Sequence, residues 1–166
     1  MYRKIEDFIN DWAYESESTL KLFNNLSDES LTKHTVSNIR TAGRLAWHII
    51  TSIGEIMHRT GLSFPTVNTD APVPNTAKEL VEEYKRTSEN LINEIKDKWN
   101  DDSLQQVDDM YGEQWKRGST LAVLINHQIH HRGQLTIVMR LNDLKVPGVY
   151  GPSKEEWSQM GMPAQE

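Results

Sequence analysis

The chain has 166 residues, with 18 Lys or Arg against 24 Asp or Glu, and a formal net charge of −6. This length suits one domain with a sizeable core, and the acidic balance argues against nucleic acid, whose binding requires a positive face. No apolar run reaches the roughly 18 residues that a membrane span needs. The first residues also lack a secretion signal, so we expect a cytoplasmic protein.

Cysteine is absent from the sequence, which excludes disulfides, thiolate metal sites and a cysteine nucleophile. A metal ion would therefore have to be bound by histidine or carboxylate side chains. The 6 His and 5 Trp residues are the features that stand out in so small an acidic chain.

The first half of the chain predicts two long helices. Apolar residues recur at helical spacing over residues 3 to 25, and residues 27 to 35 form a polar connection with room for one short turn of helix. Ser37 is predicted to cap the second helix, which runs to about Arg59 and ends before Gly61.

The middle of the chain begins with an irregular crossover. Residues 61 to 75 contain three prolines, which remove backbone donors and disfavour helix. Thr76 and Glu79 then have the spacing of a capping box, which predicts a third helix to about residue 99. Residues 101 to 117 are acidic and are expected to be irregular.

The fourth helix is expected from Ser119 to about Asn142. This stretch contains no Asp or Glu, so we expect a buried helix. A second capping box at residues 153 to 156 predicts a short C-terminal helix. With no convincing strand, the sequence predicts an all-α four-helix bundle, a single domain spanning residues 1 to 166.

Two histidines of the fourth helix point to a metal site. At about 100° per residue, His127 and His131 lie roughly 40° apart on the face that also carries Val123 and Leu124. They therefore face inward, where two imidazoles can share one ion. His48, in the middle of the second helix among apolar residues, is the best third ligand. Inward histidines can also be ordinary core residues with satisfied hydrogen bonds, and that alternative stays open.

Neighbouring residues have less certain roles. His130 lies toward the edge of the same face and is the weakest ligand candidate of its cluster. Gln134 could hold a ligand by hydrogen bond or simply pack, and Glu55 is either an acceptor or base near His48 or an exposed side chain without a role. Gln128 stands where the HExxH motif requires Glu, which disfavours a protease of that type.

Three further features carry expectations about packing. Gly133 within a helix costs about 1 kcal/mol relative to Ala, so we expect a neighbouring helix to approach closely there. Residues 111 to 115 precede the fourth helix and are candidates for the rim of the metal pocket. The tryptophans are expected to be core or interface anchors; they are Trp12, Trp47, Trp99, Trp115 and Trp157.

Three segments resemble the DinB (damage-inducible, YfiT-like) superfamily. They are Leu45-Ala46-Trp47-His48, the string from Leu124 to Leu135 that contains His127-Gln128-Ile129-His130-His131-Arg132-Gly133-Gln134, and the tail from Val146 to Ser153. The likeness spans essentially the whole chain. It implies a bundle in which His48, His127 and His131 bind a divalent metal ion, zinc or nickel, and it implies a homodimer.

The resemblance also implies chemistry on a small molecule. Relatives include thiol-dependent S-transferases and isomerases that use bacillithiol or mycothiol, and others are described as metal-dependent hydrolases. We therefore predict a metal-dependent transferase using a low-molecular-weight thiol, or a hydrolase, with no catalytic residue assigned beyond the ligands. The alternatives are a non-catalytic metal-binding helical dimer, structural or sensing, and a plain helical dimer with no metal. No motif indicates a role in DNA damage.

Overall fold

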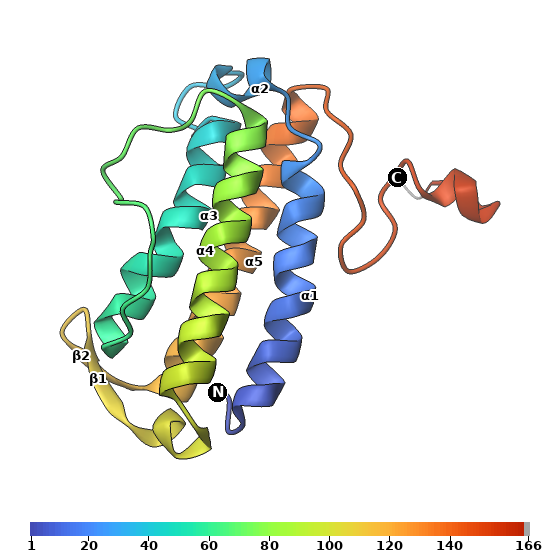
Figure 1. Ribbon diagram of the computed structural model, residues 1–166. Coiled ribbons are helices and arrows are strands. Elements are labelled where there is room, and N and C mark those ends of the chain that lie inside the picture. Colours follow the sequence, from blue (N-terminus) through green and yellow to red (C-terminus); the bar gives the residue numbers. More distant parts are fainter. Residues whose placement is uncertain (165–166) are drawn as a thin grey trace.

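A computed structural model describes residues 1 to 164, and its main feature is four long helices that run side by side (Figure 1). These helices are α1 (Ile5–Phe23), α3 (Ala42–Met57), α4 (Ala77–Lys98) and α5 (Arg117–Leu141). The shorter elements are α2 (Asp28–Thr32), β1 (Val107–Met110), β2 (Glu113–Lys116) and the 3-10 turns η1 (His58–Thr60), η2 (Asp101–Gln105) and η3 (Trp157–Met160). The prediction of a helix-dominated fold is confirmed.

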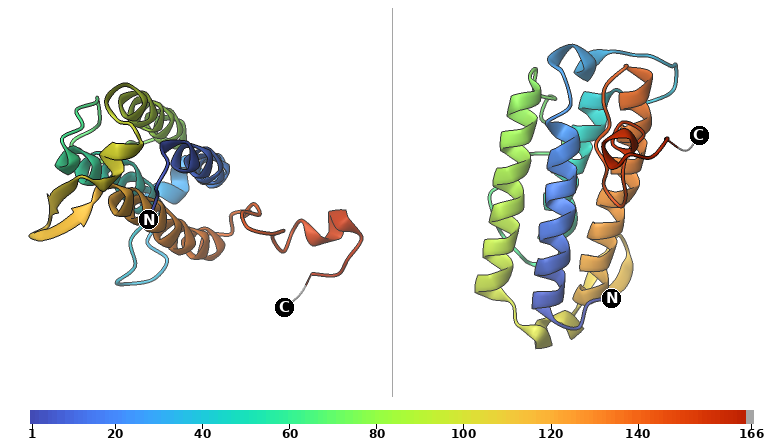
Figure 2. Two further views of the ribbon diagram at one scale, coloured as in Figure 1. Left: turned by 90° about the horizontal axis from the view of Figure 1, so that it is seen from below. Right: turned by 90° about the vertical axis from the view of Figure 1, so that its right-hand side faces the viewer.

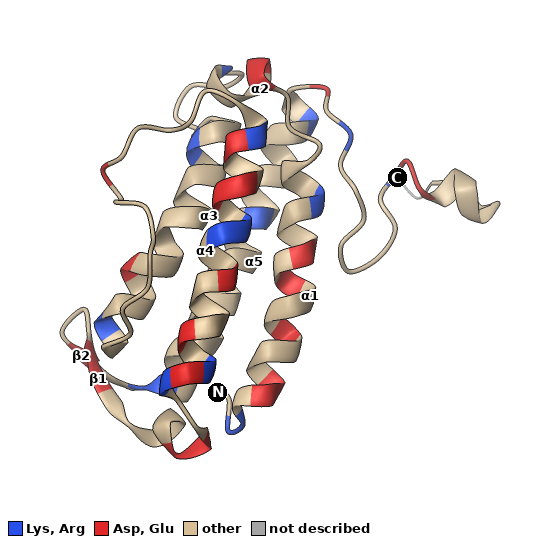
Figure 3. Ribbon diagram, in the orientation of Figure 1, with Lys and Arg blue, Asp and Glu red and all other residues tan. Residues whose placement is uncertain are grey.

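The helices enclose one apolar core. Helix α1 packs against α4 and α5, and α3 packs against the same two helices (Figure 2). Phe8, Trp12, Ile49 and Leu121 are among the fully or almost fully buried side chains. The charged residues lie along outer faces such as those of α1 and α4 (Figure 3). None of the helices in residues 1 to 164 combines the length and apolar character that crossing a bilayer requires.

Helix α3 begins later than the sequence predicts. Its N-cap is Thr41, whose hydroxyl accepts a hydrogen bond from the Arg44 amide at 3.2 Å, and the predicted cap Ser37 lies in an irregular, exposed segment. Within that segment Asn38 adopts a left-handed backbone with φ of 71°, which no helix accommodates. Residues 33 to 41 are therefore a loop that crosses from α2 to α3. The capping box of Thr76 and Glu79, in contrast, is confirmed.

The expectation of an irregular segment between α4 and α5 is also wrong, because β1 and β2 form an antiparallel hairpin there. The two turn residues, Tyr111 and Gly112, have φ angles of 61° and 88°. Two consecutive positive φ angles are typical of the tight turn whose twist matches a hairpin. Asn-Gly and Asp-Gly are the usual signals for this turn, and Tyr-Gly is not.

Helix α5 is buried on one side only, contrary to the expectation of a helix buried all round. Ile137 is 59% exposed and Gly133 is also at the surface. A Cβ atom at Gly133 would meet nothing within 4 Å, so the close helix approach expected there does not occur within this chain. The absence of acidic residues from α5 therefore does not reflect burial.

The C-terminal segment leaves the end of α5 and projects to one side of the helices (Figure 2). It is held by an ion pair between Arg140 and Glu155 and by the Glu156 carboxylate, which accepts hydrogen bonds from the Gly148 and Ser153 amides. The expected short last helix is present as the 3-10 turn η3, which begins at Trp157 rather than at Ser153.

Replacing Gly133 with Ala should stabilise the chain. A helical glycine costs conformational entropy, and the added methyl group finds open space, so we expect the free energy of unfolding in urea to rise by about 0.5–1 kcal/mol. The control is Gly118→Ala, whose Cβ would overlap the Tyr2 carbonyl oxygen and should destabilise the protein. A loss of stability in Gly133→Ala would contradict the open environment described here.

Candidate metal centre

The three predicted histidines come together between α3 and α5. The Nε2 atom of His131 lies 3.0 Å from Nε2 of His48 and 3.2 Å from Nε2 of His127. His48 comes from the middle of α3, and the other two lie on successive turns of α5. Each ring thus directs the same nitrogen to one point, as the spacing in the sequence predicts.

A buried hydrogen bond fixes how α3 and α5 meet at this point. The side chain of Gln128 is fully buried, and its Nε2 donates to the Ile49 carbonyl at 3.0 Å. Tyr84 of α4 donates to the Oε1 atom of Gln128 at 3.3 Å. Gln128 follows His127 directly and Ile49 follows His48, so this contact sets the relative height of the two helices one residue from the histidines. Gln128 therefore serves packing, which agrees with the absence of an HExxH site.

A second hydrogen bond orients one of the rings. Nδ1 of His131 lies 2.8 Å from Oε1 of Gln134, whose amide nitrogen in turn lies 3.0 Å from Nε2 of His130. With its Nδ1 proton donated to Gln134, His131 keeps a free electron pair on Nε2. Gln134 and His130 thus support the site from its edge. Nδ1 of His127 is buried and has no partner among the described residues, so packing alone orients that ring.

The surroundings keep the imidazoles neutral. Burial, together with the neighbouring imidazoles and the positive charge of Arg40, lowers the pKa of His48 and of His127 to about 4. The pKa of His131 is also lowered, mainly by burial, although its hydrogen bond to Gln134 opposes the shift. Neutral rings with free Nε2 electron pairs are the form in which histidine binds metal ions.

This arrangement fits one divalent ion. Tetrahedral zinc binds histidine nitrogens at about 2.0–2.1 Å, which places two such nitrogens about 3.3 Å apart. The observed separations of 3.0 and 3.2 Å are close to that value. In residues 1 to 164, these three histidines are the group whose donor atoms lie close enough to share an ion. Three protein ligands leave positions open for a water molecule or a substrate.

An open pocket lies against His131. Its volume is about 480 Å³, and it is bounded by the start of α3, the second half of α5 and the loop before α3. The residues that line it are Asn38, Ile39, Arg40, Leu45, His131, Gln134, Ile137 and Val138. The sequence analysis did not identify this loop or Arg40 as part of a pocket, because it placed the N-cap of the helix at Ser37, four residues before the observed cap Thr41.

Other candidate residues lie elsewhere. Glu55 is exposed and accepts a hydrogen bond from Tyr111 of the hairpin at 3.2 Å. Residues 111 to 115 therefore do not rim the pocket, which lies at the start of α3. The β1–β2 hairpin lies at the other end of that helix (Figure 1). Trp47 is buried beside His48 and donates through Nε1 to the Ala71 carbonyl. It anchors the crossover, as expected of a packing residue.

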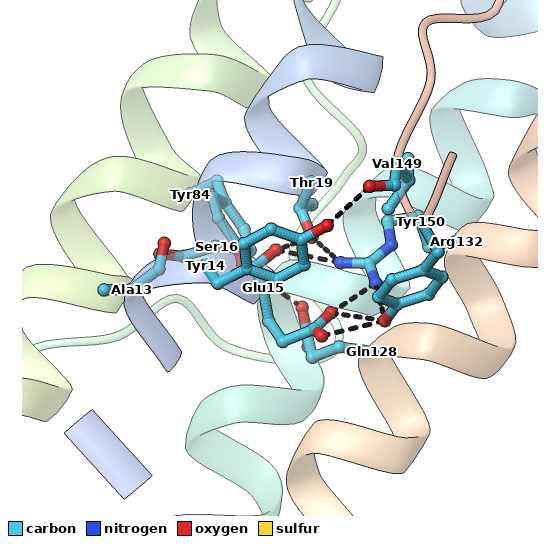
Figure 4. Close-up of polar contacts among 10 residues, drawn as sticks. All are labelled: Ala13, Tyr14, Glu15, Ser16, Thr19, Tyr84, Gln128, Arg132, Val149 and Tyr150. Carbon is cyan, nitrogen blue, oxygen red and sulfur yellow. Dashed lines mark hydrogen bonds and ion pairs between the residues drawn. The ribbon is translucent and has the colours of Figure 1, made fainter. Parts of the chain in front are cut away.

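Where α5 faces α1, a buried ion pair joins the two helices (Figure 4). The Arg132 guanidinium is 2% exposed and pairs with the Glu15 carboxylate. It also donates to the Glu15 carbonyl at 2.8 Å and to the Tyr150 hydroxyl at 2.6 Å. Tyr150 belongs to the C-terminal segment, and burial beside Glu15 raises its pKa to about 12. Arg132 and His131 are consecutive, so this contact helps to fix the rotation of α5.

Comparison with known proteins identifies the family. The model of the DinB family matches residues 1–165, so the chain belongs to that family. It is 42% identical over 164 residues to the uncharacterized protein YrdA of Bacillus subtilis (strain 168). The alignment covers 99% of this chain and 98% of that protein.

Solved structures agree with this assignment. The crystal structure of a DinB-like protein from Bacillus cereus ATCC 10987 is 42% identical, with a TM-score of 0.87 over 90% of this chain and 100% of that one. The DinB-like protein YjoA of Bacillus subtilis is 16% identical, with a TM-score of 0.68 over 86% of this chain and 97% of that one, and this likeness supports the fold alone.

Removing one member of the buried ion pair should cost much more stability than removing both. Arg132→Met leaves the Glu15 carboxylate buried without its cation, so we expect the free energy of unfolding to fall by about 3–5 kcal/mol. The double variant Arg132→Met with Glu15→Met should recover much of this loss. Tyr150→Phe, which removes one hydrogen-bonding hydroxyl, should cost only about 1 kcal/mol. Urea unfolding of these variants and of the single variant Glu15→Met measures each loss of stability. A loss in the double variant equal to the sum of the two single losses would contradict the pairing.

Proposed function

We propose that this protein is a metal-dependent enzyme of the cytoplasm that acts on a small molecule. His48, His127 and His131, held in a four-helix bundle, bind one divalent ion, zinc or nickel. The reaction we favour is transfer of a low-molecular-weight thiol to an electrophilic substrate. Metal-dependent hydrolysis is the second candidate reaction, because the same three-ligand site suits either.

The observation that carries this proposal is an open site rather than a closed one. Three Nε2 atoms meet at one point, and the described residues offer no fourth ligand. A structural zinc site is normally closed by four protein ligands, whereas catalytic sites keep a position free. The pocket of about 480 Å³ beside His131 gives a small molecule a way to that position.

The chemistry of the donor set fits thiol activation. Neutral imidazoles leave a divalent ion its full charge, and such an ion lowers the pKa of a thiol or water that binds it. The chain contains no cysteine, so the thiol must come from a small cosubstrate. Gln134 holds the His131 ring, and the apolar side chains Leu45 and Val138 exclude water from one wall of the pocket.

The reaction can be tested with an electrophile and a thiol. We expect zinc- or nickel-loaded protein to convert 1-chloro-2,4-dinitrobenzene to the thioether of bacillithiol, with chloride released and the thiol proton passed to solvent. Without the thiol, turnover should disappear. His127→Gln should reduce the rate by at least about 100-fold because it removes a ligand. Chromatography separates the thioether from dinitrophenol, the hydrolysis product.

The matched control is His58→Gln. His58 is an exposed histidine whose Nε2 contacts the Phe64 carbonyl and which is not part of the cluster, so this variant should keep the full rate. Dinitrophenol formed equally with and without thiol would favour hydrolysis. No turnover by metal-loaded protein with either thiol or water would contradict the transferase proposal for this substrate class.

A structural or sensing metal predicts a different response to metal removal. If the ion only held the helices together, chelation should unfold the protein. We expect the opposite, since the core and the Arg132–Glu15 pair are complete without an ion. Thermal unfolding with and without a chelator should therefore show a folded metal-free chain.

We also propose a homodimer. The support for this proposal is the family resemblance, because members of the DinB family are commonly homodimers. Light scattering coupled to size exclusion gives the mass directly, and a monomer at micromolar concentration would refute the dimer.

A further inference from the structure

We propose that the pocket beside the histidines is an anion subsite, in which Arg40 pairs with the acidic group of a small substrate whose apolar body lies against α5. The proposal rests on the proposed function, because it assigns a class of substrate to the same site. The substrate class is a compact anion, a carboxylate or a phosphate ester, attached to an apolar chain or ring.

The charge around the pocket is opposite to that of the whole protein. The chain as a whole has a net charge of −6, yet the described residues that line the pocket include Arg40 and no Asp or Glu. Arg40 forms no ion pair with a carboxylate in residues 1 to 164. A guanidinium without a protein partner, at the wall of a pocket, is suited to bind the carboxylate or phosphate of a ligand.

Arg40 shares the pocket wall with His131, one of the three histidines of the cluster. An acidic group bound by Arg40 in this pocket would therefore lie on the side of the cluster where His131 is reached from outside.

The loop that carries Arg40 is held at both ends. Thr35 donates to the Oδ1 atom of the buried Asn142 at 2.8 Å, and Thr41 caps α3. Between them Asn38, which lines the pocket, keeps a φ of 71°. A non-glycine residue in the left-handed region costs free energy and persists where its surroundings hold it. Arg40 is exposed and directly precedes the Thr41 cap, so its backbone is positioned by the start of α3.

The rest of the pocket wall is apolar and exposed to water. Ile39 is 42% exposed and Ile137 is 59% exposed, and Leu45 and Val138 continue the surface inward. Covering apolar side chains of this kind releases about 25 cal/mol per Å². A ligand with an apolar body gains from this surface, whereas a free inorganic anion does not.

The test is a titration of the full-length, zinc-loaded protein with hexanoate, hexyl phosphate and 1-hexanol, followed by NMR of isoleucine and valine methyl groups. We expect both anions to shift the signals of Ile137 and Val138, and hexanol to bind at least about tenfold more weakly. Arg40→Gln should weaken both anions about tenfold and leave hexanol unchanged. Arg44→Gln is the matched control, because Arg44 is exposed, lies four residues away and does not line the pocket.

The same titration of metal-stripped protein separates the role of Arg40 from that of the ion. An anion preference that survives stripping and is lost in Arg40→Gln supports the subsite. Equal anion affinities for wild type and Arg40→Gln, in loaded and stripped protein alike, would overturn it and leave the metal site standing. If the chain takes up no zinc, the proposed function fails, and the stripped arm still decides whether Arg40 binds the anion.

Discussion

The contact between α3 and α5 is the constraint on which the candidate site depends. His48 belongs to one helix and His127 with His131 to the other, so the three rings meet only at one relative height and rotation of the two helices. The buried hydrogen bond from Gln128 to the Ile49 carbonyl fixes the height. The buried pair of Arg132 with Glu15 helps to fix the rotation, because Arg132 directly follows His131 and faces α1. Gln128 and Arg132, which directly follow His127 and His131 in the sequence, therefore determine where these two histidines lie.

Different faces of α5 pack into the core and carry the histidine cluster. One side of α5 carries Gln128 and Leu135 into the core, and its neighbouring face presents His127 and His131 to α3. Next to that face, Gln134 and Ile137 line the pocket. A ligand in the pocket would thus lie against His131 without disturbing the core.

The sequence predicted the histidine cluster because helix geometry is local and regular. Two histidines four residues apart on an apolar face must share that face, and His48 was the remaining histidine among apolar neighbours. The same regularity located the long helices and the capping box at Thr76.

The features that the sequence did not predict depend on single backbone conformations and on solvent exposure. The sequence predicted a helix capped by Ser37, yet the chain is a loop there and Ile39 is 42% exposed. The hairpin turn uses Tyr111 at a positive φ, where Asn or Asp is the usual signal. Gly133 suggested a close neighbour that this chain does not supply. Arg40 is found at the pocket wall only once the loop before α3 is placed.

X-ray absorption spectroscopy at the metal edge tests the central claim most directly, using protein purified without a polyhistidine tag and loaded with one equivalent of zinc. The account predicts three imidazole nitrogens at about 2.0–2.1 Å together with at least one exchangeable oxygen ligand from water. The variant His48→Gln should lose one of these nitrogens. A spectrum with no imidazole in the first shell, or one unchanged by His48→Gln, would contradict a metal centre shared by α3 and α5.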